Sequence, residues 1–221
     1  MSSSPFHPMA VTPPSLLAVL LDTAPVTPII PKSSWSPTHH SPNFSLSRCG
    51  TVAKRTPAEQ STDGVRAAEG EQGGLHVWEV DWNLAERGSH AVLGVSTQHC
   101  PLQVSGYTAL VGGDAESWGW ELGSNQLWHG GVSCGQYPRR ATEQCPPLAV
   151  PSRVLMVLDG DAGTLGFVVD DCFLGLALQN LPVGVRLFPA VSSVWGGCRI
   201  TLRYLNGGPS KYYTSGWESD H

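Results

Sequence analysis

The segments RVLMVL (residues 153–158) and TLGFVV (residues 164–169) are joined by the polar pentapeptide DGDAG (residues 159–163). Each segment has the length of a strand, and a five-residue link that contains glycine is typical of a β-hairpin. No helical period of useful length interrupts the chain on either side, so the pattern predicts an antiparallel β-sandwich or barrel. Further strand-like segments recur outward from this hairpin at residues 75–82, 91–97, 107–111, 118–122, 127–129, 172–176, 187–191 and 199–205.

The composition agrees with short strands and argues against several classes of function. The 221 residues include 25 glycines and 18 prolines, which interrupt the chain too often for long helices. Only 14% of the residues are charged and the formal net charge is −5, so we expect no nucleic-acid partner. No segment approaches the ~20 apolar residues that span a bilayer, so we expect no membrane partner and a cytoplasmic protein.

The ends of the chain and one internal stretch lack a regular pattern. Residues 1–34 are rich in Ser, Pro and Thr, which predicts a disordered N-terminal extension. Within it, the apolar run at residues 15–21 has no Lys or Arg before it and prolines on both sides, which argues against a signal peptide. Residues 54–72 are polar and predict an extended loop.

The cysteines are even in number, as in a secreted protein with disulfides, but they are scattered and form no CxxC motif. Buried, reduced thiols are the favoured interpretation, because free cysteine is often a small core residue. The residues concerned are Cys49, Cys100, Cys134, Cys145, Cys172 and Cys198.

Motifs for catalysis or metal binding are weak. Residues 131–135 (GVSCG) match the GxSxG nucleophile motif, but a Gln-Tyr-Pro sequence follows where a helix is needed, and the only later histidine is His221. A glycine-rich surface loop explains Ser133 better than a hydrolase does. The acidic residues at 159–161 resemble the start of a calcium loop, but the later ligand positions do not fit, and a hairpin turn suffices. We therefore expect no enzyme, no metal and no cofactor.

Aromatic residues are the remaining candidates for function. Trp118 and Trp120 alternate on a predicted strand, which favours the core. Trp195 stands beside glycines between two predicted strands, so a role in recognition and a purely structural role both stay open.

Several motifs together resemble the SPRY domain-containing SOCS box protein family. They occur in the family's order from about residue 35 to about residue 206. The resemblance implies an all-β fold, a bent antiparallel two-sheet β-sandwich of SPRY type, over residues 35–208. The motifs are QSTDG (60–64), RGSHAV (87–92), GGDAESWGW (112–120), GTL (163–165) and VSSVWG (191–196).

The resemblance also implies a preformed pocket built from loops, which binds short linear peptides with an acidic residue, an aliphatic residue and consecutive asparagines. In this pocket Arg55 is expected to meet a ligand carboxylate, while Tyr107 and Trp195 supply rigid contact area. The main chain at Gly196 is expected to lie close to the peptide. Carried over position by position, the peptide-binding residues are Arg55, Pro57, Gln60, Ser61, Ser89, Tyr107, Leu110, Val194, Trp195 and Gly196.

The sequence departs from the family pattern at three places. Glu59 stands where the family usually has a small residue, and its carboxylate is expected to repel an acidic ligand. Residues 66–73 differ from the family's basic, Tyr-containing stretch. Residues 209–221 form a short divergent tail without the Leu/Cys-rich helical pattern of a SOCS box, the element that recruits elongin and a cullin.

Two functions follow from the resemblance and stay open at this point. The first is a substrate receptor of a cullin-type ubiquitin ligase that sends bound proteins to proteasomal degradation. The second is a SPRY module without a SOCS box that competes for the same targets or shields them. Recruitment of elongin separates the two.

Overall fold

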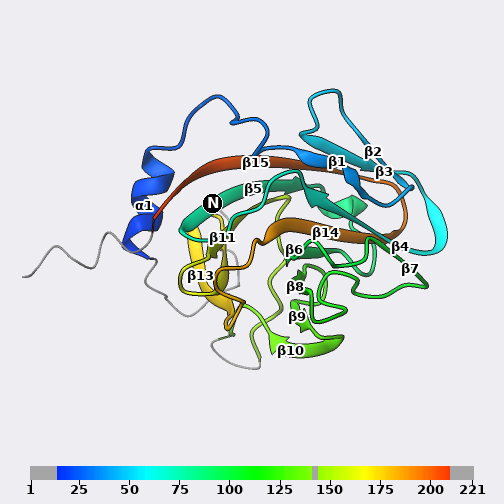
Figure 1. The fold of residues 1–221 in the computed structure, drawn as a ribbon. Helices are drawn as coiled ribbons and strands as arrows, with labels where there is room; N and C mark the ends of the chain where they lie inside the picture. The colour runs from blue at the N-terminus through cyan, green and yellow to red at the C-terminus, as the bar shows by residue number, and fades with distance from the viewer. Residues whose placement is uncertain (1–13, 141–143, 210–221) are drawn as a thin grey trace, which may run out of the picture.

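Two antiparallel sheets pack face to face in the computed structural model, which describes residues 14–140 and 144–209 (Figure 1). Sheet I has eight strands, in the order β1 (Trp35–His40), β4 (Ala58–Ala67), β14 (Phe188–Trp195), β6 (Val92–Ser96), β8 (Ser117–Glu121), β9 (Gln126–His129) and β10 (Val132–Gln136), and β7 (Gln103–Ser105) also pairs with β4. Sheet II has seven strands, in the order β13 (Cys172–Leu178), β12 (Thr164–Val169), β11 (Arg153–Asp159), β5 (Leu75–Trp82), β15 (Cys198–Gly208), β3 (Val52–Arg55) and β2 (Phe44–Leu46). The predicted two-sheet sandwich is confirmed.

The hairpin of β11 and β12 forms as predicted, except that β11 is one residue longer, so that Asp159 lies opposite Thr164 at the closed end. The Asp159 carboxylate accepts hydrogen bonds from the backbone N–H groups of Asp161 and Ala162, at 3.0 and 2.8 Å. Gly163 has φ +65°, a left-handed conformation that glycine adopts without steric cost. The residues that resemble a calcium loop therefore serve the turn.

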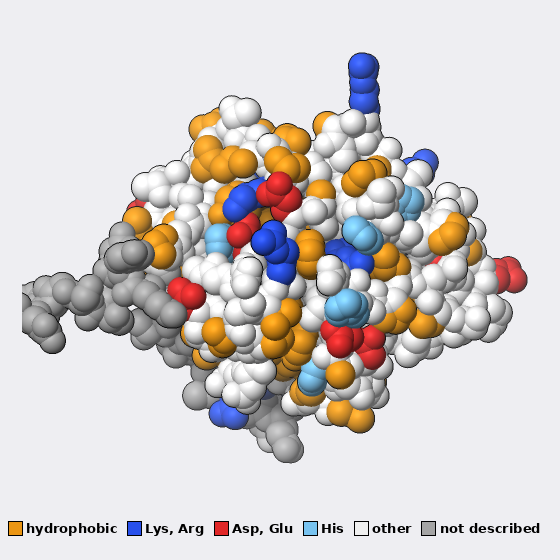
Figure 2. All heavy atoms as spheres, in the orientation of Figure 1, with side chains coloured by type: hydrophobic (Ala, Val, Ile, Leu, Met, Phe, Trp, Pro, Cys, Tyr) orange, Lys and Arg blue, Asp and Glu red, His pale blue; other side chains and the backbone are white. Residues whose placement is uncertain are grey.

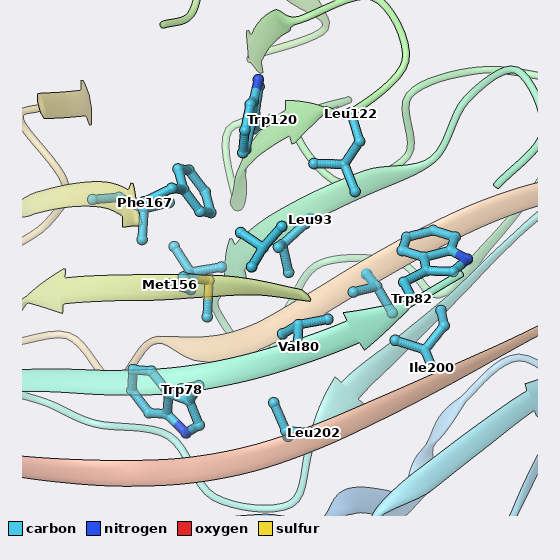
Figure 3. Packing of buried hydrophobic residues seen from close by; sticks show 14 of the residues in the cluster. Trp78, Val80, Trp82, Leu93, Trp120, Leu122, Met156, Phe167, Ile200 and Leu202 are labelled. Carbon is cyan, nitrogen blue, oxygen red and sulfur yellow. The ribbon is translucent and has the colours of Figure 1, made fainter. Parts of the chain in front are cut away.

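The core lies between the sheets and is built from alternate residues of the strands (Figure 3). Trp78, Val80 and Trp82 point inward from β5, because successive strand residues face opposite sides of a sheet. Trp120 meets Phe167 across the core with ring centroids 4.8 Å apart. Trp120 is fully buried and Trp118 is nearly so, which confirms that both are core residues.

Two further apolar clusters cover the outer faces. Helix α1 (Ser15–Asp22) lies against β15 and β5 (Figure 1), where Leu16, Leu17 and Leu20 pack on the outer face of sheet II. On sheet I, the segment from β7 to β8 buries Ala109, Leu110 and Val111 against the outer face. The structure thus differs from the expected disorder over residues 14–34, while residues 1–13 lie outside the described part of the chain.

Three local predictions are wrong. The loop expected at residues 54–72 contains β3 and β4, whose polar side chains find buried partners within the fold. The strand expected at residues 107–111 is irregular backbone, because its apolar residues cover sheet I instead of joining it. Residues 132–136, expected as a loop, form the exposed edge strand β10.

Among the described residues, Cys49, Cys100, Cys134, Cys172 and Cys198 are free thiols, as predicted. Only Cys100 and Cys198 are buried, so the expectation of burial is wrong for the exposed Cys49, Cys134 and Cys172. In residues 14–140 and 144–209, no helix is long and apolar enough to cross a membrane.

Candidate functional site

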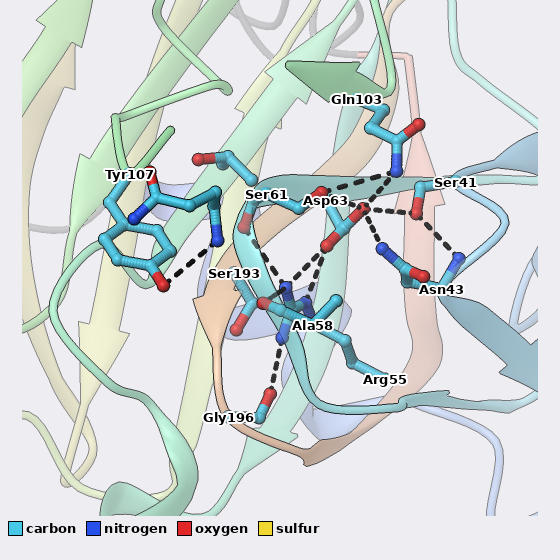
Figure 4. Close-up of polar contacts among 12 residues, drawn as sticks. Ser41, Asn43, Arg55, Ala58, Ser61, Asp63, Gln103, Tyr107, Ser193 and Gly196 are labelled. Atoms are coloured by element: carbon cyan, nitrogen blue, oxygen red, sulfur yellow. Dashed lines mark hydrogen bonds and ion pairs between the residues drawn. The ribbon is translucent and has the colours of Figure 1, made fainter. Parts of the chain in front are cut away.

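A buried ion pair between Arg55 and Asp63 organises one end of the sandwich (Figure 4). Arg55 Nη2 lies 2.6 Å and Arg55 Nε 2.9 Å from Asp63 Oδ2, and both side chains are 0% exposed. The guanidinium also donates to the backbone oxygens of Ala58, Ser61 and Gly196, at 3.2, 3.2 and 2.7 Å. One side chain of β3 therefore holds the start of β4 and the turn between β14 and β15 in fixed positions.

This geometry corrects the role predicted for Arg55. Its charge is neutralised by Asp63 and does not face solvent, so it does not meet a ligand carboxylate directly. Arg55 belongs to the site as a positioning residue. Its partner Asp63 was not predicted as a functional residue from the sequence. A carboxylate within a buried strand is a signal for a buried cation nearby.

Asp63 is held in its charged form. Burial opposes ionisation of the carboxyl, but its hydrogen-bond donors together outweigh burial and keep the pKa below its usual range. The donors, besides Arg55, are Ser41, Asn43, Ser61 and Gln103, with distances to Oδ1 between 2.6 and 3.0 Å.

The start of β4 is fixed to the loop after β7. Gln60 donates its backbone N–H to the Tyr107 hydroxyl at 3.1 Å and accepts a hydrogen bond from the N–H of Gly106 at 2.8 Å. Gln60 has φ +52°, a conformation that residues other than glycine rarely adopt. The Tyr107 ring remains 38% exposed, so it presents a rigid aromatic surface beside the strained start of β4.

Trp195 ends β14 opposite Ala58 and is the second aromatic residue of the site. It is 61% exposed and has φ +57°. Left-handed backbone at non-glycine residues stores strain and is found preferentially at functional sites. A hollow of about 380 Å³ opens beside it, lined by Pro57, Ala58, Glu59, Trp195, Gly196 and Gly197.

The remaining predicted residues divide into exposed and supporting groups. Pro57 and Ser89 are exposed and Ser61 is partly exposed. Leu110 and Val194 are buried and can only support the site from beneath. The backbone next to Ser89 lies close to the end of β14, because a Cβ atom added to Gly88 would be 3.5 Å from the Val194 carbonyl oxygen. Ser89 is therefore near the other predicted residues.

Ser133 lacks the setting of a nucleophile. It stands on the exposed edge strand β10, and its hydroxyl donates to the side-chain oxygen of Gln126. The strand pairs with β9 and ends before the irregular segment at residues 137–140, so the strand–turn–helix geometry of a nucleophile elbow is not formed.

Lys and Arg side chains do not gather into a patch on the face of the described residues that Figure 2 shows; they are interspersed with acidic and apolar ones. This distribution agrees with the net charge of −5 and differs from the concentrated positive surface that binds nucleic acid.

Comparisons with known proteins match both the sequence and the fold. The SPRY domain family matches residues 75–204. SPRY domain-containing SOCS box protein 2 of Mus musculus is 43% identical over 197 residues, covering 88% of this chain and 74% of the relative. SPRY domain-containing SOCS box protein 1 of Homo sapiens is 43% identical over 198 residues, covering 88% and 72%. Protein gustavus of Drosophila melanogaster is 41% identical over 198 residues, covering 88% and 70%.

Solved structures of low sequence identity share the fold. The TRIM65 PSpry domain superposes with a TM-score of 0.60 at 21% identity, covering 89% of this chain and 98% of that chain. The SPRY domain of human HERC1 gives a TM-score of 0.57 at 16% identity, covering 77% and 98%. Among SOCS box protein 2 relatives, the chain spans between 64% of the Rattus norvegicus protein and 74% of the Mus musculus protein.

Proposed function

This chain belongs to the SPRY domain-containing SOCS box protein family, whose SPRY domain is a protein-interaction module, and from that premise we propose that it binds short linear peptides at the Tyr107–Trp195 site. The expected ligand is an extended segment of a target protein with an acidic residue, an aliphatic residue and consecutive asparagines. The protein acts as a binding protein and not as an enzyme.

The observation that carries the proposal is the pair of exposed aromatic rings beside strained, fixed backbone. Gln60 and Trp195 both have positive φ, and the carbonyls around them are held by Arg55. Such a site needs little reordering when a peptide binds, so less of the contact energy is lost to ordering. Exposed Tyr and Trp rings on rigid backbone are typical binding hot spots.

Replacement of Tyr107 tests the proposal. Tyr107→Ala removes an anchoring ring and is expected to weaken binding of an acidic, Asn-rich peptide by more than ~1 kcal/mol, about fivefold, in a peptide-array screen followed by calorimetry. Tyr107→Phe keeps the ring and loses only the hydrogen bond to Gln60, so it is expected to bind more tightly than the alanine variant. Equal affinity of wild type and Tyr107→Ala for every bound peptide contradicts the proposal.

We further propose that the bound peptide marks a target for a cullin-type ubiquitin ligase and for proteasomal degradation. The support is family membership, since SPRY domain-containing SOCS box proteins 1 and 2 are among the relatives with more than 40% identity. Co-precipitation of elongin with this chain supports the ligase role. Peptide binding without elongin supports instead a module that competes for the same targets and shields them.

A further inference from the structure

Two hollows adjoin at the proposed peptide site. The first is the 380 Å³ hollow beside Trp195. The second, of about 340 Å³, is lined by Lys54, Arg55, Thr56, Pro57, Glu86, Gly197, Cys198 and Arg199. Pro57 and Gly197 line both. A peptide that crosses this shared edge therefore contacts both hollows.

The first hollow carries a single negative charge without a partner. Glu59 is exposed, follows Ala58 directly and so lies beside Trp195, which pairs with Ala58. Within the described part of the chain, no cation forms an ion pair with Glu59. The buried Arg55 does not offset its charge, because Asp63 already neutralises the guanidinium. A carboxylate and an exposed indole in one hollow can bind a Lys or Arg side chain through an ion pair and a cation–π contact.

The second hollow carries the opposite charge. Lys54 and Arg199 stand directly opposite one another on the antiparallel strands β3 and β15, and both are exposed. Like charges in this position destabilise a sheet, so an anion bound between them relieves repulsion. The nearby acid Glu86 uses Oε2 to accept the Arg199 backbone N–H at 2.9 Å. In residues 14–140 and 144–209, neither Lys54 nor Arg199 has an ion-pair partner.

We propose that the two hollows form a bipolar cleft that selects peptides with charges of opposite sign at their two ends. The Lys54–Arg199 end takes an acidic side chain, and the Glu59–Trp195 end takes a basic one. The backbone between them crosses over Pro57 and Gly197. This inference rests on the proposed function and names the class of peptide: an acidic residue alone is not enough, because a cationic residue on the other flank completes the fit.

A charge-scanning titration tests the inference. The probes are amidated and acetylated peptides with an acidic residue, an aliphatic residue and consecutive asparagines, in which each flanking position in turn is Lys, Gln or Asp. A second set carries Gln in place of the acidic residue. Calorimetry gives Kd for wild type, Glu59→Gln, Lys54→Gln and Arg199→Gln. The control Asp170→Asn removes the same charge as Glu59→Gln at the exposed β12–β13 turn, outside both hollows.

At one flanking position, we expect the Lys peptide to bind wild type at least about fivefold more tightly than the Asp peptide. This preference is expected to be lost in Glu59→Gln and kept in Asp170→Asn. Lys54→Gln and Arg199→Gln are expected to weaken peptides that keep the acidic residue and to leave those with Gln in its place unchanged. Peptides that bind without any preference at the flanks, or a preference that survives in Glu59→Gln, overturn the bipolar cleft and leave the proposed function standing. Absence of binding by every peptide overturns both.

Discussion

At the scale of single residues, the site depends on a charge pair that is sealed from solvent. Removing two charges from water is costly, and such a pair rarely adds stability compared with apolar residues of similar volume. Here the Arg55 guanidinium, paired with Asp63, also donates to three backbone carbonyls at the start of β4 and in the turn after β14. The pair therefore fixes the backbone on both sides of Gln60 and next to Trp195, while its own charges are sealed from solvent.

Replacement of Asp63 by asparagine leaves the Arg55 guanidinium buried without a counter-charge. We expect Asp63→Asn to lower the free energy of unfolding by about 3–5 kcal/mol, measured by urea denaturation. Glu79→Gln breaks the half-exposed pair with Arg153 and serves as the matched control, with an expected loss below ~1 kcal/mol. Similar losses in the two variants contradict the role given to Asp63.

Glu59 gives the hollow beside Trp195 its negative charge. Glu59→Ala removes a carboxylate that repels acidic side chains, so we expect tighter binding of an Asn-rich peptide whose flanks carry only acidic residues. Calorimetry with wild type and variant checks this, and an unchanged or weaker affinity rejects it.

The exposed residues of the candidate site could be proposed from the sequence more readily than the arrangement of its buried ones. Gln60 and Trp195 lie in family motifs and Tyr107 was carried over by its position, and the structure brings the three to one end of the sandwich. The orientation of Arg55 could not be predicted, because it depends on Asp63 on β4 and on the Gly196 carbonyl, 141 residues away in the chain.

At the scale of elements, the local pattern predicted strands best where alternation and turn residues agree. β5 and β12 have the expected boundaries and β11 is one residue longer than expected, since alternation and turn residues specify all three. Strand β4 was missed because its first half is polar and its buried residues include Thr62, Asp63 and Arg66, which are satisfied only by distant partners. Helix α1 was not predicted because an eight-residue helix is stabilised more by packing against sheet II than by its own sequence.

The contribution of α1 docking to the free energy of unfolding can be measured with one substitution. Leu17 is buried against the outer face of sheet II, so Leu17→Ala is expected to destabilise the protein by roughly 2–3 kcal/mol in denaturant unfolding. Val19 is 42% exposed on the same helix, and Val19→Ala is expected to change stability by less than ~0.5 kcal/mol. Equal, small effects would mean that α1 is not docked in solution.

At the scale of the whole molecule, stability is expected to fall in two stages as pH decreases. Burial lowers the pKa of His76, whose ring contacts the Tyr204 hydroxyl at 2.9 Å and the Gly73 carbonyl at 2.7 Å. Below about pH 6.5 the unfolded chain binds a proton at this position that the folded chain resists, so stability decreases. The lowered pKa of Asp63 adds a second loss once pH falls below about 3.9, where the unfolded carboxyl becomes protonated first.

Urea denaturation at a series of pH values between 7 and 3 checks this profile. His76→Asn cannot titrate, so it is expected to remove the first stage and to leave the second. A stability that stays constant from pH 7 to pH 5 in wild type, or falls equally in the variant, contradicts the assignment to His76.

The central claim is that Tyr107, Gln60 and Trp195 form one preformed surface for an extended peptide, and amide chemical-shift mapping tests it most directly. Titration of the ¹⁵N-labelled chain with an acidic, Asn-rich peptide is expected to shift the amides of residues 58–61, 106–108 and 195–197 together, with a single Kd. Shifts confined to another part of the molecule, such as β10 or the face of sheet II against which α1 packs, would contradict the account.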